Sequence, residues 1–153
     1  MHQLFTAIRI NAPRGFVWNV LIDLKRYPEW NPYIPRITGQ LAKQQILKVH
    51  ARPSGTMGRT FYPEVLAVTP PKELRWVGRL PRPGILDGEH IFELESLDKK
   101  TVELIHRENF TGWMAPMHKL FRLAATRRGF EEMNAALKQR AEQLYLLSDS
   151  NSS

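Results

Sequence analysis

The sequence predicts an α+β fold in which a curved, antiparallel, seven-stranded sheet packs around one long C-terminal helix. Apolar residues recur every three or four positions from 123 to 144, which is the period of an amphipathic helix. Residues 34–110 instead carry short alternating segments separated by turn-forming residues, as in an antiparallel meander. One more alternating segment, at residues 3–10, precedes two short helical segments. The predicted order is therefore strand, two short helices, six strands and a final helix.

The N-terminal strand is predicted at residues 3–10. One of its faces carries Leu4, Thr6, Ile8 and Ile10. Pro13 then suits the first turn of a helix, and apolar residues at helical spacing follow as far as Leu24. This helix should end by Arg26, because Pro28 disfavours the helical conformation at the residue before it. Residues 27–32 predict a turn or a single helical turn that is rich in aromatic residues.

Six strands are predicted in the middle of the chain, at residues 34–42, 44–52, 58–69, 73–81, 88–97 and 101–110. The breaks between them contain Pro, Gly, Ser and Asp residues, which favour turns. Pro63 lies inside the third of these segments, and proline cannot donate a backbone hydrogen bond to a neighbouring strand. We therefore expect an edge position or a bulge at Pro63.

The long helix is predicted from about Gly112 to Leu147, which is longer than most helices of globular proteins. Its apolar stripe contains Leu123, Thr126, Phe130, Met133, Asn134, Leu137, Ala141 and Leu144. If the sheet curves more than the helix, their side chains cannot fill all the space between them. We therefore expect a cavity that is lined by the inner face of the sheet and by this stripe. A single ligand-binding domain would span residues 3–147, and the polar residues 148–153 predict a disordered tail.

Composition excludes several classes of protein. The 153 residues include no cysteine, so disulfides and thiol catalysis are excluded. No apolar run approaches the roughly 20 residues that cross a bilayer, and the N-terminus does not have the pattern of a signal peptide. A cytoplasmic location is therefore expected. The net charge of +7 is spread along the chain without a basic block, so no nucleic-acid partner is expected.

Several segments resemble a known family. Residues 10–24, followed by Tyr27-Pro28-Glu29-Trp30-Asn31-Pro32, are similar to the opening of the START-like (SRPBCC) superfamily, in its polyketide cyclase/dehydrase-like branch. Further matching segments are residues 70–76, 88–94, 106–112 and 128–134. The resemblance covers roughly residues 3 to 145 and implies a helix-grip domain with a deep pocket for an apolar or amphipathic small molecule. It does not imply a fixed catalytic motif, because fold alone does not determine function.

Two polar residues are predicted on the inward face of the last strand. By alternation, that face carries Val102, Leu104, His106, Glu108 and Phe110. The Cα atoms of His106 and Glu108 would then be about 6–7 Å apart. A turn at residues 98–100 would place Phe92 opposite His106 and His90 opposite Glu108, which gathers two imidazoles and a carboxylate. A register shift of one residue would turn these side chains outward.

Three roles fit this cluster. A histidine beside a carboxylate can transfer protons near neutral pH, as a ketone or polyketide substrate would require. The candidate catalytic residues are His106, Glu108 and Arg127, which lies at the edge of the helical stripe. The same groups could instead anchor the polar end of a ligand, with Arg127 facing Glu108 or an anionic head. The third reading is a buried structural pair without contact to a ligand.

The predicted ligand-binding residues combine this cluster with neighbouring side chains of the sheet and the helix. They are Trp76, His90, Phe92, Leu104, His106, Glu108, Phe110, Arg127, Phe130, Asn134 and Leu137. Trp30, Tyr33, Trp113, Met114 and residues 81–86 are predicted in loops, and such loops lie near the pocket mouth of helix-grip folds. They are candidates for a gate or for a rim that touches a membrane transiently, with ordinary loop packing as the alternative.

The favoured hypothesis is a module that carries or senses a small hydrophobic or amphipathic molecule, such as a lipid, a quinone or a polyketide-like aromatic. The alternative is a polyketide cyclase/dehydratase-like enzyme that uses general acid–base chemistry without a cofactor. A third hypothesis is a protein of membrane or nucleic-acid surfaces that is attracted by the net charge. No metal site is predicted, because the five histidines lack ligand spacing on a helix. The pattern does not indicate an oligomeric state.

Overall fold

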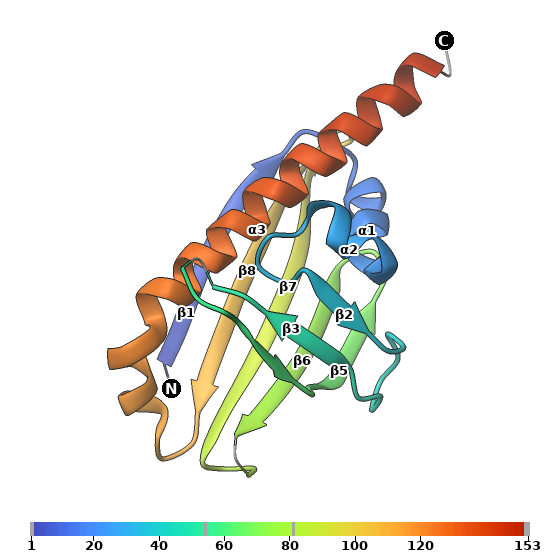
Figure 1. The fold of residues 1–153 in the computed structure, drawn as a ribbon. Coiled ribbons are helices and arrows are strands. Elements are labelled where there is room, and N and C mark those ends of the chain that lie inside the picture. The colour runs from blue at the N-terminus through green and yellow to red at the C-terminus, as the bar shows by residue number, and fades with distance from the viewer. Residues whose placement is uncertain (1, 54, 81, 152–153) are drawn as a thin grey trace.

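The computed structural model in Figure 1 describes residues 2–53, 55–80 and 82–151. The side chains at residues 80 and 117–123 lie outside this description, and Leu123 of the predicted stripe is among them. The strands and helices are β1 (His2–Ile10), α1 (Arg14–Ile22), the 3-10 turn η1 (Leu24–Arg26), α2 (Tyr27–Trp30), β2 (Arg36–Thr38), β3 (Lys48–Ala51), β4 (Arg59–Phe61), β5 (Glu64–Thr69), β6 (Glu73–Leu80), β7 (Leu86–Asp98), β8 (Thr101–Thr111) and α3 (Ala115–Asn151). This is the predicted α+β architecture, with short helices after the first strand and a long helix at the end.

The strands of the described residues form two antiparallel sheets, so the prediction of one seven-stranded sheet is wrong in strand count. The larger sheet has five strands in the order β1-β8-β7-β6-β5, and the smaller has three in the order β2-β3-β4. The predicted strand at residues 58–69 is divided into β4 and β5 around Pro63, which has no N–H to continue the ladder. The Pro63 carbonyl instead accepts a hydrogen bond from the Leu47 amide (2.9 Å). This bond joins the loop before β3 to the connection between β4 and the edge strand β5.

The strands β2 and β3 are shorter than predicted. The segments 34–42 and 44–52 were expected to be extended, but they contribute only three and four residues to the small sheet. Gly39 and Gln44 between them have positive φ angles of 124° and 73°, which turn the chain instead of extending it. The predicted strand at 73–81 is present as far as residue 80, and Pro81 lies outside the described residues.

The helix α3 starts close to the predicted position but ends later. It continues to Asn151, so residues 148–151, which were predicted to be disordered, are helical. Residues 152 and 153 lie outside the described part of the chain. α3 packs along β1 and against α1, and its C-terminal end projects past the sheet (Figure 1). None of the described helices is long and apolar enough to cross a bilayer.

The predicted stripe holds α3 against the sheet. Its buried members are Phe130, Met133, Asn134, Leu137 and Ala141. Two polar side chains beside the stripe fasten the helix to the chain that leaves β1. The ammonium group of Lys138 donates to the carbonyl of Arg9 (2.9 Å), and the carboxylate of Glu142 accepts from the amide of Asn11 (2.7 Å). Apolar burial and hydrogen bonds therefore fix the same orientation of the helix.

Gly129 allows the loop before β2 to approach α3 closely. A Cβ atom at this position would lie 2.3 Å from the ring of Tyr33, closer than two such carbons can approach. The Tyr33 ring is buried there and packs edge-to-face on Phe130, with 5.7 Å between ring centroids. The contact brings Tyr33 and the small sheet over the inner face of the large sheet.

The inner face of the large sheet has a gap where two glycines lie opposite each other. Gly78 of β6 pairs with Gly88 of β7, and Gly88 pairs with Phe110 of β8. By alternation, these positions share the inner face with Trp76 and His90. Because neither glycine has a side chain, the layer of side chains between the large sheet and the elements packed on it is incomplete at this point. The fold therefore leaves space above this part of the sheet.

Candidate functional site

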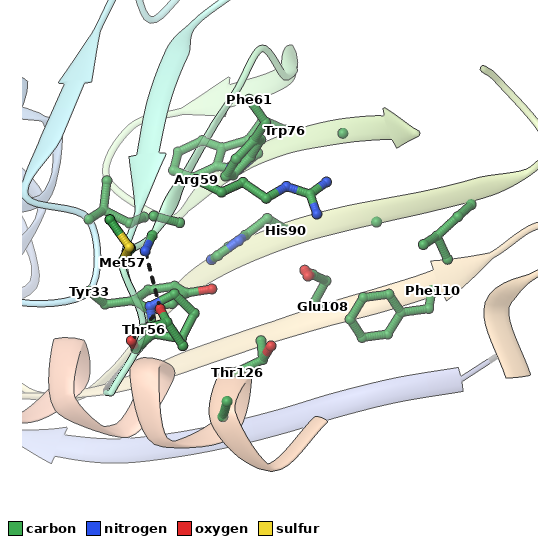
Figure 2. Close-up of a pocket in the computed structure, with 18 residues that line it drawn as sticks. Tyr33, Thr56, Met57, Arg59, Phe61, Trp76, His90, Glu108, Phe110 and Thr126 are labelled. Atoms are coloured by element: carbon green, nitrogen blue, oxygen red, sulfur yellow. Dashed lines mark hydrogen bonds between the residues drawn. The ribbon is translucent and has the colours of Figure 1, made fainter. Parts of the chain in front are cut away.

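A cavity of about 480 Å³ lies over the glycine gap, between β6, β7 and β8 on one side and the small sheet and α3 on the other (Figure 2). Its lining residues are Tyr33, Ile34, Ala51, Pro53, Thr56, Met57, Gly58, Arg59, Phe61, Trp76, Gly78, Leu86, Gly88, His90, Glu108, Phe110, Ala125 and Thr126. Most of the wall is aromatic or aliphatic, with a few polar groups. Such a composition is typical of sites that enclose an organic molecule and orient it by a small number of polar contacts.

Glu108 projects from β8 into the cavity (Figure 2). Its carboxyl group makes no hydrogen bond or ion pair with any described residue, and the residue is half-buried. Burial raises the pKa of this carboxyl to about 7. Gly88 on the neighbouring strand β7 leaves room for it, because a Cβ atom there would lie 3.4 Å from the carboxyl carbon. Glu108 can therefore bind or release a proton near neutral pH.

Tyr33 and Arg59 reach the same part of the cavity from its other walls. Figure 2 shows the Tyr33 hydroxyl and the Arg59 guanidinium extending toward the space beside Glu108. Burial, together with the charge of Glu108, raises the pKa of Tyr33, so its hydroxyl remains a hydrogen-bond donor. Arg59 is exposed and forms no ion pair with a described carboxylate. A cation, a phenol and a carboxyl group of variable charge thus surround one space.

A chain of buried hydrogen bonds lies beneath the cavity. Nε2 of His90 contacts Nε2 of His106 at 2.5 Å, and Nδ1 of His106 contacts Oδ1 of Asn134 at 2.7 Å. The amide nitrogen of Asn134 donates to the hydroxyl of Thr6 (2.9 Å), and this hydroxyl donates to the backbone carbonyl of His106 (2.6 Å). Among these groups only His90 lines the cavity. The chain therefore connects the cavity floor to α3 and to β1.

Aromatic rings enclose both imidazoles. The ring of Phe130 is nearly parallel to that of His106, with 3.9 Å between centroids and 5° between planes. The ring of Trp76 lies 5.0 Å from that of His90, and Phe92 stacks on both histidines. Burial lowers the pKa of His106 to about 3, and it lowers the pKa of His90 well below its usual value. Both histidines are therefore neutral at physiological pH.

The family follows from the sequence together with this geometry. A family described as "Polyketide cyclase / dehydrase and lipid transport" matches residues 1–143. The chain belongs to this family. A comparison with curated proteins gives no match.

Solved structures with the same fold include proteins of different chemistry. An aromatase/cyclase from a Streptomyces species, Zhui, superposes with a TM-score of 0.74 at 16% identity, covering 93% of this chain and 94% of that one. A START superfamily protein from Mycobacterium smegmatis gives a TM-score of 0.71 at 19% identity, covering 94% and 99%. Norcoclaurine synthase from Thalictrum, in complex with a transition-state analogue, gives 0.70 at 11% identity, covering 93% and 94%. At these identities the comparisons establish the helix-grip fold, and not the substrate.

The structure brings part of the predicted site together. The predicted register is confirmed, because Phe92 pairs with His106 and His90 pairs with Glu108. The predicted residues that line the cavity are Trp76, His90, Glu108 and Phe110. The predicted residues that lie in the packed layer beside or beneath it are Phe92, Leu104, His106, Phe130, Asn134 and Leu137. The helical stripe therefore fills most of the space that it was expected to line, and among the α3 side chains that the structure describes only those of Ala125 and Thr126 reach the cavity.

Arg127 does not join the cluster. Its side chain is exposed and donates to the backbone carbonyl of Phe5 on β1 (3.1 Å). The prediction that it faces Glu108 is therefore wrong, because position 127 lies on the flank of α3 that meets the edge strand. His106 is separated from the cavity as well, since it is fully buried and both of its ring nitrogens have partners. Of the three predicted catalytic residues, only Glu108 can touch a ligand in this cavity.

The contribution of the small sheet to the cavity is not evident from the sequence. The outer wall is formed by Ala51, Pro53 and residues 56–59, and nothing in their local pattern distinguishes them from other surface residues. The two glycines carried a usable signal. With the predicted alternation, Gly78 falls on the face of Trp76, which indicates a missing side chain in the inner layer.

The predicted rim is present in part. Tyr33 and Leu86 line the cavity, whereas Trp30 packs on Tyr27 with 5.0 Å between ring centroids. Trp113 is 72% exposed but does not line the cavity, and the large hydrophobic lining residue that is exposed is Met57, at 93%. Transient contact of this region with a membrane surface stays a prediction.

Proposed function

We propose that this member of the family binds a small hydrophobic or amphipathic molecule in the cavity, and carries or senses it. The observation that carries the proposal is the cavity itself, whose aromatic wall is interrupted by a carboxyl group without a protein partner. A half-buried carboxyl group without a protein partner is open to a ligand, and a ligand that pairs with it gains the corresponding hydrogen bond. A volume of about 480 Å³ suits a molecule of two or three fused rings or a short lipid-like chain.

Replacing Ala125 by Trp is expected to block the cavity. Ala125 is half-buried in the wall formed by α3, so an indole at this position fills the space that the ligand needs. Naphthalene, a small aromatic probe, should bind the wild-type protein and bind the Ala125→Trp variant at least about tenfold more weakly. Isothermal titration calorimetry or the change in probe fluorescence measures both affinities.

The neighbouring residue supplies a matched control. Ala124 is exposed and does not line the cavity, so Ala124→Trp adds the same indole to the same helix without filling the cavity. This control should retain the wild-type affinity. Equal affinities for the wild type and for Ala125→Trp would show that the probe binds elsewhere and would count against the proposal.

A second candidate function is catalysis of proton transfer at a carbonyl compound. Its support is the near-neutral pKa of Glu108, in a cavity that also contains the Arg59 guanidinium and the Tyr33 hydroxyl. As a general base, the ionised Glu108 would take a proton from the carbon next to a ketone. The negative charge would then develop on the ketone oxygen, where Arg59 or Tyr33 could stabilise it. Glu108, now protonated, would act as the acid and give this proton back in a dehydration or cyclisation step.

Glu108→Gln tests this candidate, because an amide cannot act as the base. With 2-tetralone in heavy water, the wild-type protein should accelerate exchange of the α-hydrogens, and the rate should rise with pH around about 7 as Glu108 ionises. The variant should lose about 100-fold of this acceleration and its pH dependence. Proton NMR follows the exchange. A wild-type rate no faster than buffer alone, in protein that binds naphthalene, would leave the binding function and remove the catalytic one.

A further inference from the structure

The buried chain beneath the cavity fixes the hydrogen positions of both histidines. The backbone carbonyl of His106 can only accept a hydrogen bond. The Thr6 hydroxyl lies 2.6 Å from this carbonyl oxygen and must therefore donate its single hydrogen to it. The same hydroxyl oxygen lies 2.9 Å from the Asn134 side chain and can only accept in that contact. The Asn134 group that faces Thr6 is therefore its NH₂ group.

The orientation of Asn134 then determines the tautomer of His106. With its NH₂ group toward Thr6, Asn134 directs its oxygen at Nδ1 of His106, 2.7 Å away. An oxygen acceptor requires a hydrogen on that nitrogen, so His106 carries its proton on Nδ1. Because burial keeps the imidazole neutral, Nε2 of His106 has no hydrogen and is an acceptor.

The next contact transfers this constraint to His90. Its Nε2 lies against Nε2 of His106 and must donate, so His90 carries its proton on Nε2 and a lone pair on Nδ1. Burial keeps this second imidazole neutral as well. Nδ1 of His90 has no hydrogen-bond partner among the described residues. It differs from Nε1 of Trp76, which has no partner either but is fully enclosed by protein atoms. Since His90 lines the cavity, this lone pair is available to a ligand.

We propose that Nδ1 of His90 is a fixed hydrogen-bond acceptor that selects aromatic ligands carrying a hydroxyl group, a phenol or an enol, at that point of the cavity. The proposal rests on the proposed binding function and specifies its ligand class. Trp76 and Phe110 supply flat apolar walls, while the acceptor favours an O–H over an ether or a hydrogen atom. Thr6 is a positioning residue in this scheme, because it sets the acceptor from outside the cavity.

Three probes of similar size test the selectivity of the wild-type protein. We expect 2-naphthol to bind about tenfold more tightly than 2-methoxynaphthalene, which cannot donate a hydrogen bond. In His90→Phe, which keeps an aromatic ring, the two affinities should become equal. Equal affinities of both probes for the wild type, with naphthalene bound, would overturn the selectivity alone. Failure of all three probes to bind would overturn the selectivity and the proposed function together.

Nitrogen-15 NMR of the histidine rings tests the deduction without a ligand, and also serves if His90→Phe does not fold. The spectra should show the Nε2–H tautomer for His90 and the Nδ1–H tautomer for His106. Thr6→Val removes the hydroxyl that orients Asn134, so we expect mixed tautomers and loss of most of the tenfold preference for 2-naphthol. Thr6→Ser should restore both. An Nδ1–H tautomer of His90 in the wild type would overturn the proposal.

Discussion

Acidification from about pH 7.5 to about pH 4.5 is expected to lower the free energy of unfolding of the Glu108→Gln variant by on the order of 3 kcal/mol or more. The reason is the pair of neutral histidines in the core. Burial lowers the pKa of His106 from its ordinary 6.5 to about 3, and that of His90 is lowered as well. Below about pH 6.5 the unfolded chain therefore binds protons that the folded protein does not, and unfolding becomes progressively easier.

Glu108 acts in the opposite direction, which is why the variant is needed. The pKa of its carboxyl is raised to about 7 in the folded protein, so the folded state binds this proton more readily than the unfolded chain. The resulting stabilisation is complete below about pH 4.5 and is lost as the pH rises through about 7. In the wild type it partly offsets the effect of the histidines, and Glu108→Gln removes it.

Urea denaturation at a series of pH values measures this effect. Combining Glu108→Gln with His90→Phe and His106→Leu should abolish most of the pH dependence, whatever the absolute stability of that triple variant. The histidine explanation fails if the Glu108→Gln variant and the triple variant lose stability equally between about pH 7.5 and about pH 4.5.

Phe130→Ala is expected to reduce the free energy of unfolding by about 3–5 kcal/mol. Phe130 is fully buried, and its ring stacks on that of His106 at 3.9 Å and contacts Tyr33 edge-to-face. It is the largest side chain of the α3 stripe beneath the cavity. Its truncation leaves a void where helix, sheet and the Tyr33 loop meet, and it removes the cover of the buried histidines. Thermal and urea denaturation followed by circular dichroism would measure the loss.

Leu146→Ala is the control on the same helix. Leu146 is 67% exposed, in the C-terminal part of α3, so its truncation should change stability by no more than about 0.5 kcal/mol. A cost below about 1 kcal/mol for Phe130→Ala would mean that the stripe does not hold α3 against the sheet as described.

The fold was predictable because its signals are periodic. Alternation located β1, β7 and β8, and it gave the pairing of His90 with Glu108 correctly. Helical spacing identified the stripe from Phe130 to Ala141, all of which is buried at the predicted positions. Periodicity specifies which face of an element is buried, but it does not specify what covers that face.

The cavity wall could not be predicted for that reason. Pro63 indicated an irregularity, yet the separation of β4 from β5 and the return of a small sheet over the large one depend on long-range bonds such as that from Leu47 to Pro63. These contacts bring Arg59 into the cavity. Arg127 was misplaced because a position at the edge of a helical stripe can face either side, and here the carbonyl of Phe5 is the partner.

The location of a bound probe tests the central claim most directly. In the complex of the wild-type protein with naphthalene, intermolecular nuclear Overhauser effects should connect the probe to the rings of Trp76 and Phe110, which line the cavity. None should reach Phe5 or Trp113, which are exposed apolar side chains outside it. Contacts confined to Phe5 or Trp113, with none to Trp76 or Phe110, would contradict the account.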